Sequence, residues 1–279
     1  MLLLVASRPD AASMGQREAL LRVPGWTEHG RLGDAPILRR DDLALVTIPD
    51  LHLYRDGIDR EAQIALGEAP EAVVFLSKHR SESGTPSLTV HPIGNLGSAD
   101  LGGRPRTLVP ADPHRMTDTL RAIRREAAGT GYAVTFEATH HGPHLETPAF
   151  FIEAGSTETE WSDPRAAEIL MRALLSVRAR DGPVAVGVGG GHYTPRLTDL
   201  ALRRDVALAH LVPGYDLPQL DDEMLDQIIA RSRGASLVYF HRKAIEKPVL
   251  RDLERRFEAR GLRAVREDDL DPLPGSQSY

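Results

Sequence analysis

Apolar runs of strand length recur along the chain. Several are continuous rather than alternating, which is typical of strands buried on both faces of a parallel sheet. The predicted strands are Leu2–Ala6, Leu43–Ile48, Ala72–Leu76, Ser87–His91, Tyr132–Ala138, Phe150–Glu153, Val184–Val188, Val206–Val212 and Ser236–Phe240.

Segments with helical periodicity lie between many of these runs. In residues 113–128, Met116, Leu120 and Ile123 share one stripe, and Asp112-Pro113 is a typical helix start. The same start signal recurs at Asp163-Pro164, and further helices are predicted over residues 221–232 and 247–259. Alternating strands and amphipathic helices predict a layered α/β fold, with a mixed, largely parallel sheet flanked by helices.

The segments between these elements set the domain organisation. Glycines and prolines predict loops over residues 24–42 and 94–113, and a long loop inside a compact domain is often functional. We expect a single α/β catalytic domain over residues 1–266, in which a weak boundary near Pro213–Gln219 would set off a small C-terminal lobe. Residues 267–279 are acidic and then polar, which predicts a frayed tail.

Composition narrows the classes of partner and chemistry. The 279 residues carry a formal charge of -6, which argues against a generally basic nucleic-acid-binding protein but allows a local basic groove. The chain has no cysteine, so His, Asp or Glu must hold any metal. The apolar start lacks the basic segment of a signal peptide, and no apolar run approaches the length of a membrane span. We therefore expect a cytoplasmic protein without membrane contact or a stable protein partner.

Six of the eleven histidines fall in four motifs at or beyond the ends of predicted strands. Because ligands of open α/β sheets bind beyond the carboxyl ends of strands, this placement predicts one shared site. The six are His79, His91, His140, His141, His144 and His192.

Two of these motifs have specific geometric implications. Adjacent residues of an extended segment point to opposite sides, so at most one of His140 and His141 should face a common centre. Glu137 and His144 are within reach as a second ligand or an orienting partner. The loop Gly189, Gly190, Gly191 precedes a Thr194-Pro195 helix start, which favours phosphate or carboxylate binding over a simple tight turn.

These residue types favour a metal-assisted or histidine-assisted hydrolase. Zinc held by His nitrogens and a carboxylate, with one open position, supplies hydroxide at neutral pH. The chain lacks a Gly-x-Ser-x-Gly elbow and the fixed-spacing zinc signature His-Glu-x-x-His, so spacing alone does not define the ligands.

Five motifs together resemble one family. Over about residues 1–240, the chain resembles the archaeal and plant type of D-aminoacyl-tRNA deacylase. Each motif is modest alone, but five in the same order are specific. The motifs are Ser77-Lys78-His79-Arg80-Ser81-Glu82-Ser83-Gly84, His91-Pro92-x-Gly94-Asn95, Glu137-Ala138-Thr139-His140-His141-Gly142-Pro143, the stretch from Phe151 to Trp161, and Val186-Gly187-x-Gly189-Gly190-Gly191-His192-Tyr193.

The resemblance implies a reaction, a cofactor and a fold. Members of this family hydrolyse the ester that joins a D-amino acid to the 3′-terminal adenosine of tRNA, and thereby keep D-residues out of translation. The family is zinc-dependent, and its fold is similar to the phosphorylase/peptidyl-tRNA hydrolase group. The expected cofactor is therefore zinc, and the expected partner is tRNA carrying a D-amino acid.

Roles for individual residues follow as hypotheses from this resemblance. The metal would be held by His141 and His192 with His91 or Glu153, although Glu153 could instead pair with an arginine for structure. His79, Glu82 and His140 are the catalytic candidates, the first two for proton transfer to the ribose oxygen. The predicted substrate contacts are Lys78, Arg80, Asn95, Gly189, Gly190 and Gly191.

A tRNA substrate also requires a basic surface. We favour the cluster of Arg121, Arg124 and Arg125 with its neighbours over a stripe in residues 251–260, where interleaved glutamates indicate a salt-bridged solvent face. Two other classes stay open at this point: a phosphorylase or nucleosidase acting on a small nucleoside, and a non-catalytic RNA-binding module.

Overall fold

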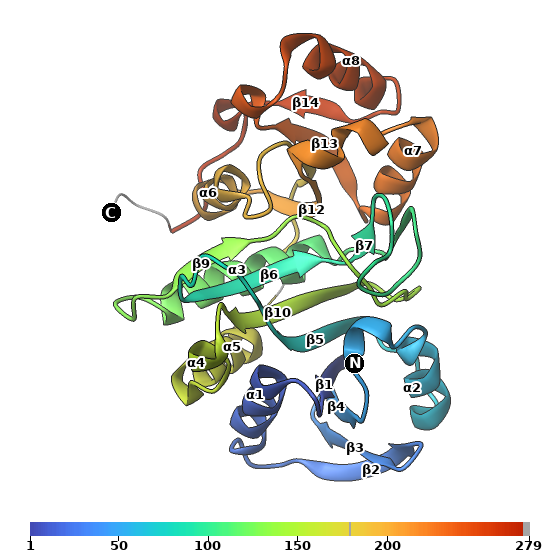
Figure 1. Ribbon diagram of the computed structural model, residues 1–279, viewed down its shortest axis with the longest axis vertical. Coiled ribbons are helices and arrows are strands. Elements are labelled where there is room, and N and C mark those ends of the chain that lie inside the picture. Colours follow the sequence, from blue (N-terminus) through green and yellow to red (C-terminus); the bar gives the residue numbers. More distant parts are fainter. Residues whose placement is uncertain (179, 276–279) are drawn as a thin grey trace.

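Two β-sheets, one above the other in Figure 1, form the centre of the molecule. The computed structural model describes residues 1–178 and 180–275. The larger sheet has the strand order β2 (Thr27–Leu32), β3 (Ala35–Arg40), β4 (Leu43–Ile48), β1 (Leu2–Ser7), β5 (Ala72–Lys78), β10 (Ala149–Gly155), β6 (Ser87–Pro92), β9 (Ala133–Phe136). The smaller sheet has the order β12 (Ala207–Val212), β11 (Val184–Val188), β13 (Ala235–Phe240), β14 (Arg263–Val265).

Strand direction confirms the mixed, largely parallel sheet. In the larger sheet β4, β1, β5 and β10 run parallel, β10 and β6 run antiparallel, and β9 runs parallel to β6. The smaller sheet is wholly parallel. The α/β fold class is therefore confirmed, and every predicted strand is present within a few residues of its expected bounds. The likeness to the phosphorylase/peptidyl-tRNA hydrolase group stays a prediction.

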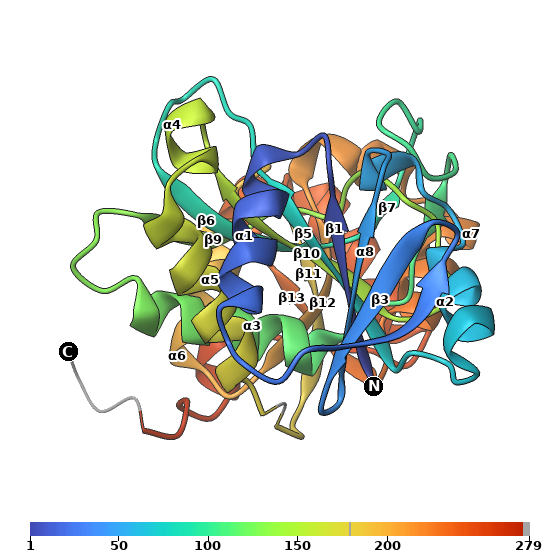
Figure 2. The ribbon, with the colours of Figure 1, turned by 90° about the horizontal axis from the view of Figure 1, so that it is seen from below.

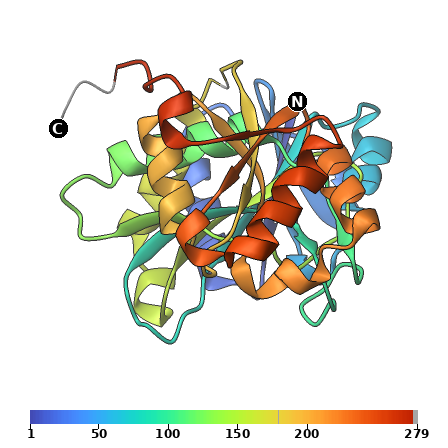
Figure 3. The same ribbon diagram turned by 90° about the horizontal axis from the view of Figure 1, so that it is seen from above.

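Helices cover both faces of the larger sheet and the outer side of the smaller one. They are α1 (Ala11–Leu21), α2 (Ile58–Leu66), α3 (Pro113–Glu126), α4 (Glu158–Trp161), α5 (Pro164–Ser176), α6 (Pro195–Arg203), α7 (Asp222–Arg231) and α8 (Lys247–Glu258). Viewed from below, α1, α3 and α5 lie along one side of the larger sheet and α2 along the other (Figure 2). Viewed from above, α7 and α8 lie over the smaller sheet (Figure 3).

The strand side chains alternate between separate cores, as expected for strands buried on both faces. In β1, Leu2 and Leu4 pack with α1, α3 and α5, whereas Leu3 and Val5 pack with α2. The first of these cores continues into the smaller sheet through residues such as Leu208, because α3 contacts both β6 and β12. The two sheets are therefore held in one packed unit across α3.

Three parts of the sequence-based outline need correction. Residues 24–42 are not mainly loop, because Thr27–Leu32 and Ala35–Arg40 form an antiparallel hairpin at the sheet edge. Helices α1 and α2 were not predicted, and residues 94–113 contain the short pair β7 (Gly94–Asn95) and β8 (Thr107–Leu108).

The C-terminal part differs from the expected outline in two places. The smaller sheet begins at Val184, well before the boundary considered near Pro213. The chain does not fray at residue 267: Glu267 contacts Arg196 and Arg204, Leu270 is buried, and Leu273 N donates to Arg203 O at 2.8 Å. Residues 276–279 of the predicted tail lie outside the described residues. Among the described helices, none combines the length and apolar character needed to cross a bilayer.

Candidate active site at the junction of the two sheets

The segment after β9 connects the two sheets. Ala138 N donates to His192 O at 2.8 Å, in the loop that follows β11. Thr139 N donates to Leu211 O at 2.8 Å, and Leu211 N donates to Thr139 Oγ1 at 2.9 Å. Because these bonds join the edge of the larger sheet to β12 and the β11 loop, histidines from both sheets meet at this junction.

The larger sheet contributes three side chains from β5, β10 and β6, the strands that precede β9 in the sheet order. His79 follows β5, where its amide donates to Ala154 O at 2.8 Å and its carbonyl accepts from Trp161 Nε1 at 2.8 Å. His91 of β6 stacks on Phe151 of β10, with ring centroids 5.0 Å apart, and Glu153 lies two residues further along β10. All three polar side chains are buried.

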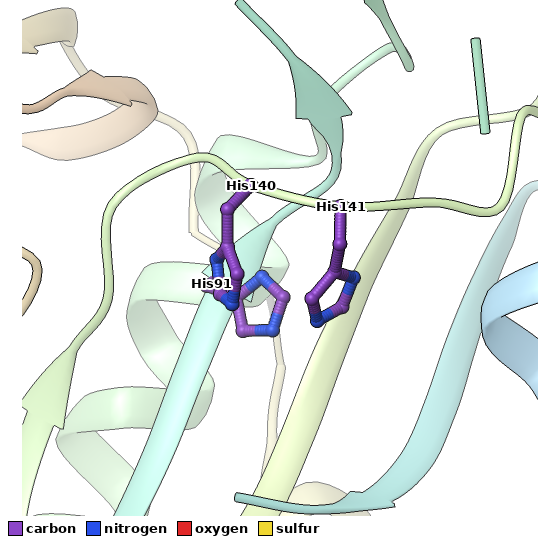
Figure 4. Close-up of side chains that lie close together, drawn as sticks. All are labelled: His91, His140 and His141. Atoms are coloured by element: carbon purple, nitrogen blue, oxygen red, sulfur yellow. The ribbon is translucent and has the colours of Figure 1, made fainter. Parts of the chain in front are cut away.

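Three imidazoles converge with their tautomers fixed (Figure 4). The Nδ1 atoms of His91, His140 and His141 lie 3.0, 2.8 and 2.9 Å from the carbonyl oxygens of Pro92, Ala138 and Gly142. A carbonyl only accepts hydrogen bonds, so each Nδ1 carries the proton and each Nε2 of a neutral ring keeps its lone pair.

This arrangement fits a metal ion. One ligand atom from each of the three histidines lies within 4.8 Å of the others. Among the described residues, the buried His91 Nε2 has no hydrogen-bond partner. A histidine whose other nitrogen donates to a backbone carbonyl is the usual form of an oriented metal ligand. Nitrogen donors of this kind suit zinc and other first-row metals.

The prediction that His140 and His141 face opposite ways is wrong. His141 has a φ of 44°, in the left-handed region, so the chain is not extended there. The two ring centroids lie 4.1 Å apart, and both rings lie close to His91. The next residue, Gly142, packs so closely against the loop at Gly103 that a Cβ would come within 2.1 Å of Gly103 N. Both histidines therefore reach the same centre.

Glu137 is the residue around which the remaining imidazoles gather. Its Oε1 lies 3.0 Å from His79 Nδ1, and its Oε2 lies 2.9 Å from His192 Nε2 and 3.7 Å from His140 Nε2. Glu153 lies 3.6 Å from both His79 Nδ1 and His91 Nε2. The sequence predicts Glu137 as a second ligand or an orienting partner, and its contacts with His79, His140 and His192 are those of an orienting partner.

The pKa shifts follow from burial and from these two carboxylates. Burial opposes charge on His79, but the adjacent carboxylates of Glu137 and Glu153 raise its pKa to about 11. Burial and repulsion from His91 lower the pKa of His141 to about 3 and that of His140 well below its ordinary value. Although burial favours their neutral forms, the histidines hold the pKa of Glu137 well below the ordinary value and that of Glu153 at about 2. The site thus holds two neutral imidazoles beside ionised carboxylates and a charged His79.

Tyr193 was missed as a site residue. Its hydroxyl lies 2.5 Å from His79 Nε2, and the two rings meet edge to face with centroids 5.4 Å apart. The residue directly before it, His192, lies at the mouth of the site, with 36% of its side chain exposed. The sequence signal for Tyr193 is its position at the end of the glycine motif.

Other predicted site residues lie outside this cluster. Glu82 and Arg80 are exposed and line a surface hollow with Trp161, and Lys78 Nζ lies 4.8 Å from the Trp161 ring centroid. Asn95 is buried, and its side-chain amide donates to the carbonyl oxygens of Gly102 and Arg104, so it holds the loop packed beside Gly142. His144 also points elsewhere, with Nε2 3.3 Å from Glu146 Oε1.

The glycine loop forms as predicted, but one of its amides is already hydrogen-bonded within the protein. Gly189 and Gly190 have positive φ values, and Gly189 N donates to Val212 O at 2.8 Å. Helix α6 starts at Pro195, as expected. Anion binding by Gly189, Gly190 and Gly191 stays a prediction.

One of the three arginines predicted to form a basic surface on α3 is not at the surface. Arg121 is buried, and its guanidinium donates to the carbonyl oxygens of Ala201, Arg204 and Val206. It therefore joins α3 to the end of α6 and cannot contact tRNA. Arg124 and Arg125 are exposed, but they precede the amino end of β9, whereas the histidine cluster follows its carboxyl end.

The last helix has the salt-bridged face that its sequence predicted. Arg256 and Arg260 pair with Asp222 at 3.0 Å, and Arg260 pairs with Asp226 at 2.6 Å. Asp222 and Asp226 belong to α7, and α8 itself supplies Asp252, which pairs with Arg255 at 2.6 Å and with Arg256 at 3.7 Å.

The predicted metal ligands divide between neighbouring groups of side chains. Among the described residues, three sets have ligand atoms within 4.8 Å of one another: His91 with His140 and His141, Glu137 with His140 and His192, and His79 with Glu137 and Glu153. The structure thus groups His140, rather than His192 or Glu153, with His91 and His141. Fold and site together define an α/β protein with a buried histidine–carboxylate centre, equipped to hold a metal and to move protons.

Comparison with known proteins identifies the family. The sequence profile of D-aminoacyl-tRNA deacylase matches residues 66–265. The chain is 36% identical to the D-aminoacyl-tRNA deacylase of Methanosarcina mazei over 96% of this chain and 92% of that protein. It is also 36% identical to the D-aminoacyl-tRNA deacylase of Methanococcoides burtonii over 98% of this chain, which spans only 58% of that longer protein. The chain belongs to the D-aminoacyl-tRNA deacylase family.

A solved structure supports the fold over nearly the whole chain. The crystal structure of AF0625, described as a conserved protein of unknown function, superposes with a TM-score of 0.90 at 30% sequence identity. The match covers 97% of this chain and 96% of the other. Both sheets, and the junction between them, therefore belong to the shared fold.

Proposed function

We propose that this chain hydrolyses the ester between a D-amino acid and the 3′-terminal adenosine of tRNA, releasing free tRNA and the D-amino acid. The observation that carries the proposal is the family profile over residues 66–265, which spans the whole histidine–carboxylate centre from His79 to His192. We further propose that this reaction takes place in the cytoplasm, where aminoacyl-tRNA is used.

The three oriented histidines support a zinc cofactor. His91, His140 and His141 would hold the ion through Nε2, since each Nδ1 is engaged by a carbonyl oxygen. Zinc supplies a Lewis acid that polarises an ester and makes water a stronger acid. Phe151, stacked on His91 and edge-on to His141, gives this side of the centre an apolar wall.

The side chains around Glu137 support acid–base roles. His192 donates from Nε2 to Glu137, which leaves Nδ1 on the outer side of the ring, 3.4 Å from Tyr215 Oη. Because the carboxylate engages Nε2, Nδ1 is left to act as a base, so His192 is placed to accept a proton from water.

His79 and Tyr193 are suited to return a proton to the leaving oxygen. The pKa of about 11 keeps His79 charged, so its Nδ1 forms an ion pair with Glu137 and its Nε2 donates to the Tyr193 hydroxyl. That hydroxyl can then donate its own proton to the ribose oxygen and take another from His79. Glu82 is exposed in the following loop, which supports Tyr193 in this role instead.

One assay tests the proposal. The protein is incubated with D- and L-aminoacyl-tRNA, with and without a chelator, and amino-acid release is followed. We expect release from the D-substrate, loss of activity with chelator, and recovery on adding zinc. Absence of D-selective release would overturn the proposed reaction, and chelator-resistant release would overturn the zinc requirement.

A further inference from the structure

A basic hollow of about 580 Å³ lies beyond the carboxyl ends of β13 and β14. In parallel α/β sheets, this edge is where ligands bind. The cationic side chains that line the hollow are Arg196 from α6, Arg242 and Lys243 after β13, and Arg266 after β14, together with His241. This edge belongs to the smaller sheet and contains none of the buried histidines described above.

The hollow is electropositive although the chain is acidic overall. Its two carboxylates, Glu267 and Asp268, are already paired with arginines of the α6 segment: Glu267 with Arg196 and Arg204, and Asp268 with Arg204 at 3.1 Å. Lys243 and Arg266 are exposed. Within residues 1–178 and 180–275, neither of them forms an ion pair.

Further polar groups in the hollow are also unmatched. Arg242 Nε is buried without a hydrogen-bond partner among the described residues, while the other end of the guanidinium contacts Glu254. Burial and repulsion from Arg196 and Lys243 lower the pKa of His241. An anion bound near these groups would accept a hydrogen bond from Arg242 Nε and relieve the repulsion at His241.

The glycine loop lies between this hollow and the histidine cluster. Gly190 packs against His241, so that a Cβ at Gly190 would lie 3.2 Å from His241 Nδ1. Two residues later, His192 contacts Glu137, and Tyr193 contacts His79. Arg196, one turn further along, lines the hollow. A ligand that occupies both places would therefore need negative charge in the part that enters the hollow.

We propose that this hollow binds a backbone phosphate of the tRNA strand whose 3′ end enters the histidine cluster. The proposal rests on the proposed function for the identity of the strand. Arg and Lys recognise phosphodiesters through charge and hydrogen bonds without reading the base sequence. The hollow would thus position any tRNA, in keeping with an enzyme that recognises the attached amino acid rather than the anticodon.

The test compares two double variants that remove the same charge. Lys243→Ala/Arg266→Ala empties the hollow of its unpaired cations. Arg60→Ala/Arg165→Ala removes two exposed arginines from α2 and α5 and is the control. Binding of uncharged tRNA is measured by fluorescence anisotropy at several salt concentrations. We expect Kd to rise about tenfold or more in the first variant. The slope of log Kd against log salt concentration should fall by the amount expected for the loss of about two phosphate contacts. Both quantities should change little in the control.

Kinetics separate this proposal from the proposed function. In the hollow variant, kcat/KM should fall about tenfold more for D-aminoacyl-tRNA than for the D-aminoacyl ester of adenosine, which has no phosphodiester. Failure of the wild-type protein to hydrolyse either ester would overturn the proposed function but leave the binding test intact. An unchanged Kd, an equal loss in both double variants, or no tRNA binding by the wild-type protein would overturn the role of the hollow.

Discussion

His79 Nδ1 lies 3.0 Å from Glu137 Oε1, and both side chains are buried. The other oxygen of the same carboxylate lies 2.9 Å from His192 Nε2. His79 follows a strand of the larger sheet and His192 follows a strand of the smaller one. A single carboxylate therefore orients two imidazoles that come from different sheets.

The first prediction concerns that carboxylate. Glu137→Gln keeps the size of the side chain but removes the negative charge that stabilises protonated His79 and orients His192. Because general acid–base catalysis contributes about 100-fold or more, we expect kcat for D-aminoacyl-tRNA to fall by at least about 100-fold. Steady-state kinetics measure this effect, and thermal melting shows whether the variant folds.

The control is Glu18→Gln on the exposed face of α1. It makes the same chemical change outside the site and should leave kcat within about twofold of wild type. A folded Glu137→Gln variant with normal kcat would contradict the central place given to Glu137.

The second prediction concerns the metal. Replacement of His140 or His141 by Ala removes one of the three proposed ligands, so zinc affinity should fall about 10-fold to 100-fold or more. Zinc content of the purified, dialysed protein, measured by mass spectrometry, is the readout. His29→Ala, at an exposed histidine of β2, is the control. Unchanged zinc content in both site variants would exclude this ligand set.

The third prediction separates a structural arginine from an exposed one. Arg121→Met leaves three backbone carbonyl oxygens and Asp118 without their buried partner. Breaking a buried pair of this kind costs about 3 kcal/mol, so the free energy of unfolding should fall by about that amount. Denaturant titration measures it. Arg124→Met, three residues along the same helix at an exposed position, should change it little. Equal stability of the two variants would contradict this division of roles.

The fourth prediction concerns pH and His210, a buried residue of β12. Its Nε2 donates to Val109 O at 3.0 Å, and burial lowers its pKa to about 4. The unfolded chain binds this proton with a pKa of about 6.5, so protonation favours unfolding. The contribution of neutral His210 is complete above pH 6.5 and is lost as the pH falls toward 4, at a cost of about 3 kcal/mol.

Denaturant titrations between pH 7 and pH 4 measure this loss. His210→Asn removes the titrating group, so the variant should be less stable at pH 7 but lose less stability on acidification than wild type. His29→Asn should keep the wild-type pH dependence. If the His210 variant lost as much stability on acidification as wild type, other groups would be responsible for that loss.

The strands were predictable because their signal is local. Continuous apolar runs mark Leu43–Ile48 and Val184–Val188 with the bounds that the structure has. The hairpin strand Thr27–Leu32 was missed because its residues are mostly exposed and polar, so neither a continuous nor an alternating apolar pattern is present. In that hairpin, backbone pairing with Ala35–Arg40 decides the conformation, and side-chain pattern does not.

The α/β layering and the gathering of histidines at strand ends can be predicted from the amino-acid sequence, because both follow from short-range patterns and from the direction of parallel strands. How those histidines are used depends on contacts between distant parts of the folded chain. The left-handed turn at His141, the position of Glu137 between two sheets and the burial of Arg121 each depend on partners far away in the chain. Such partners are chosen by packing and hydrogen bonding across the sheet junction, for which no local pattern carries a signal.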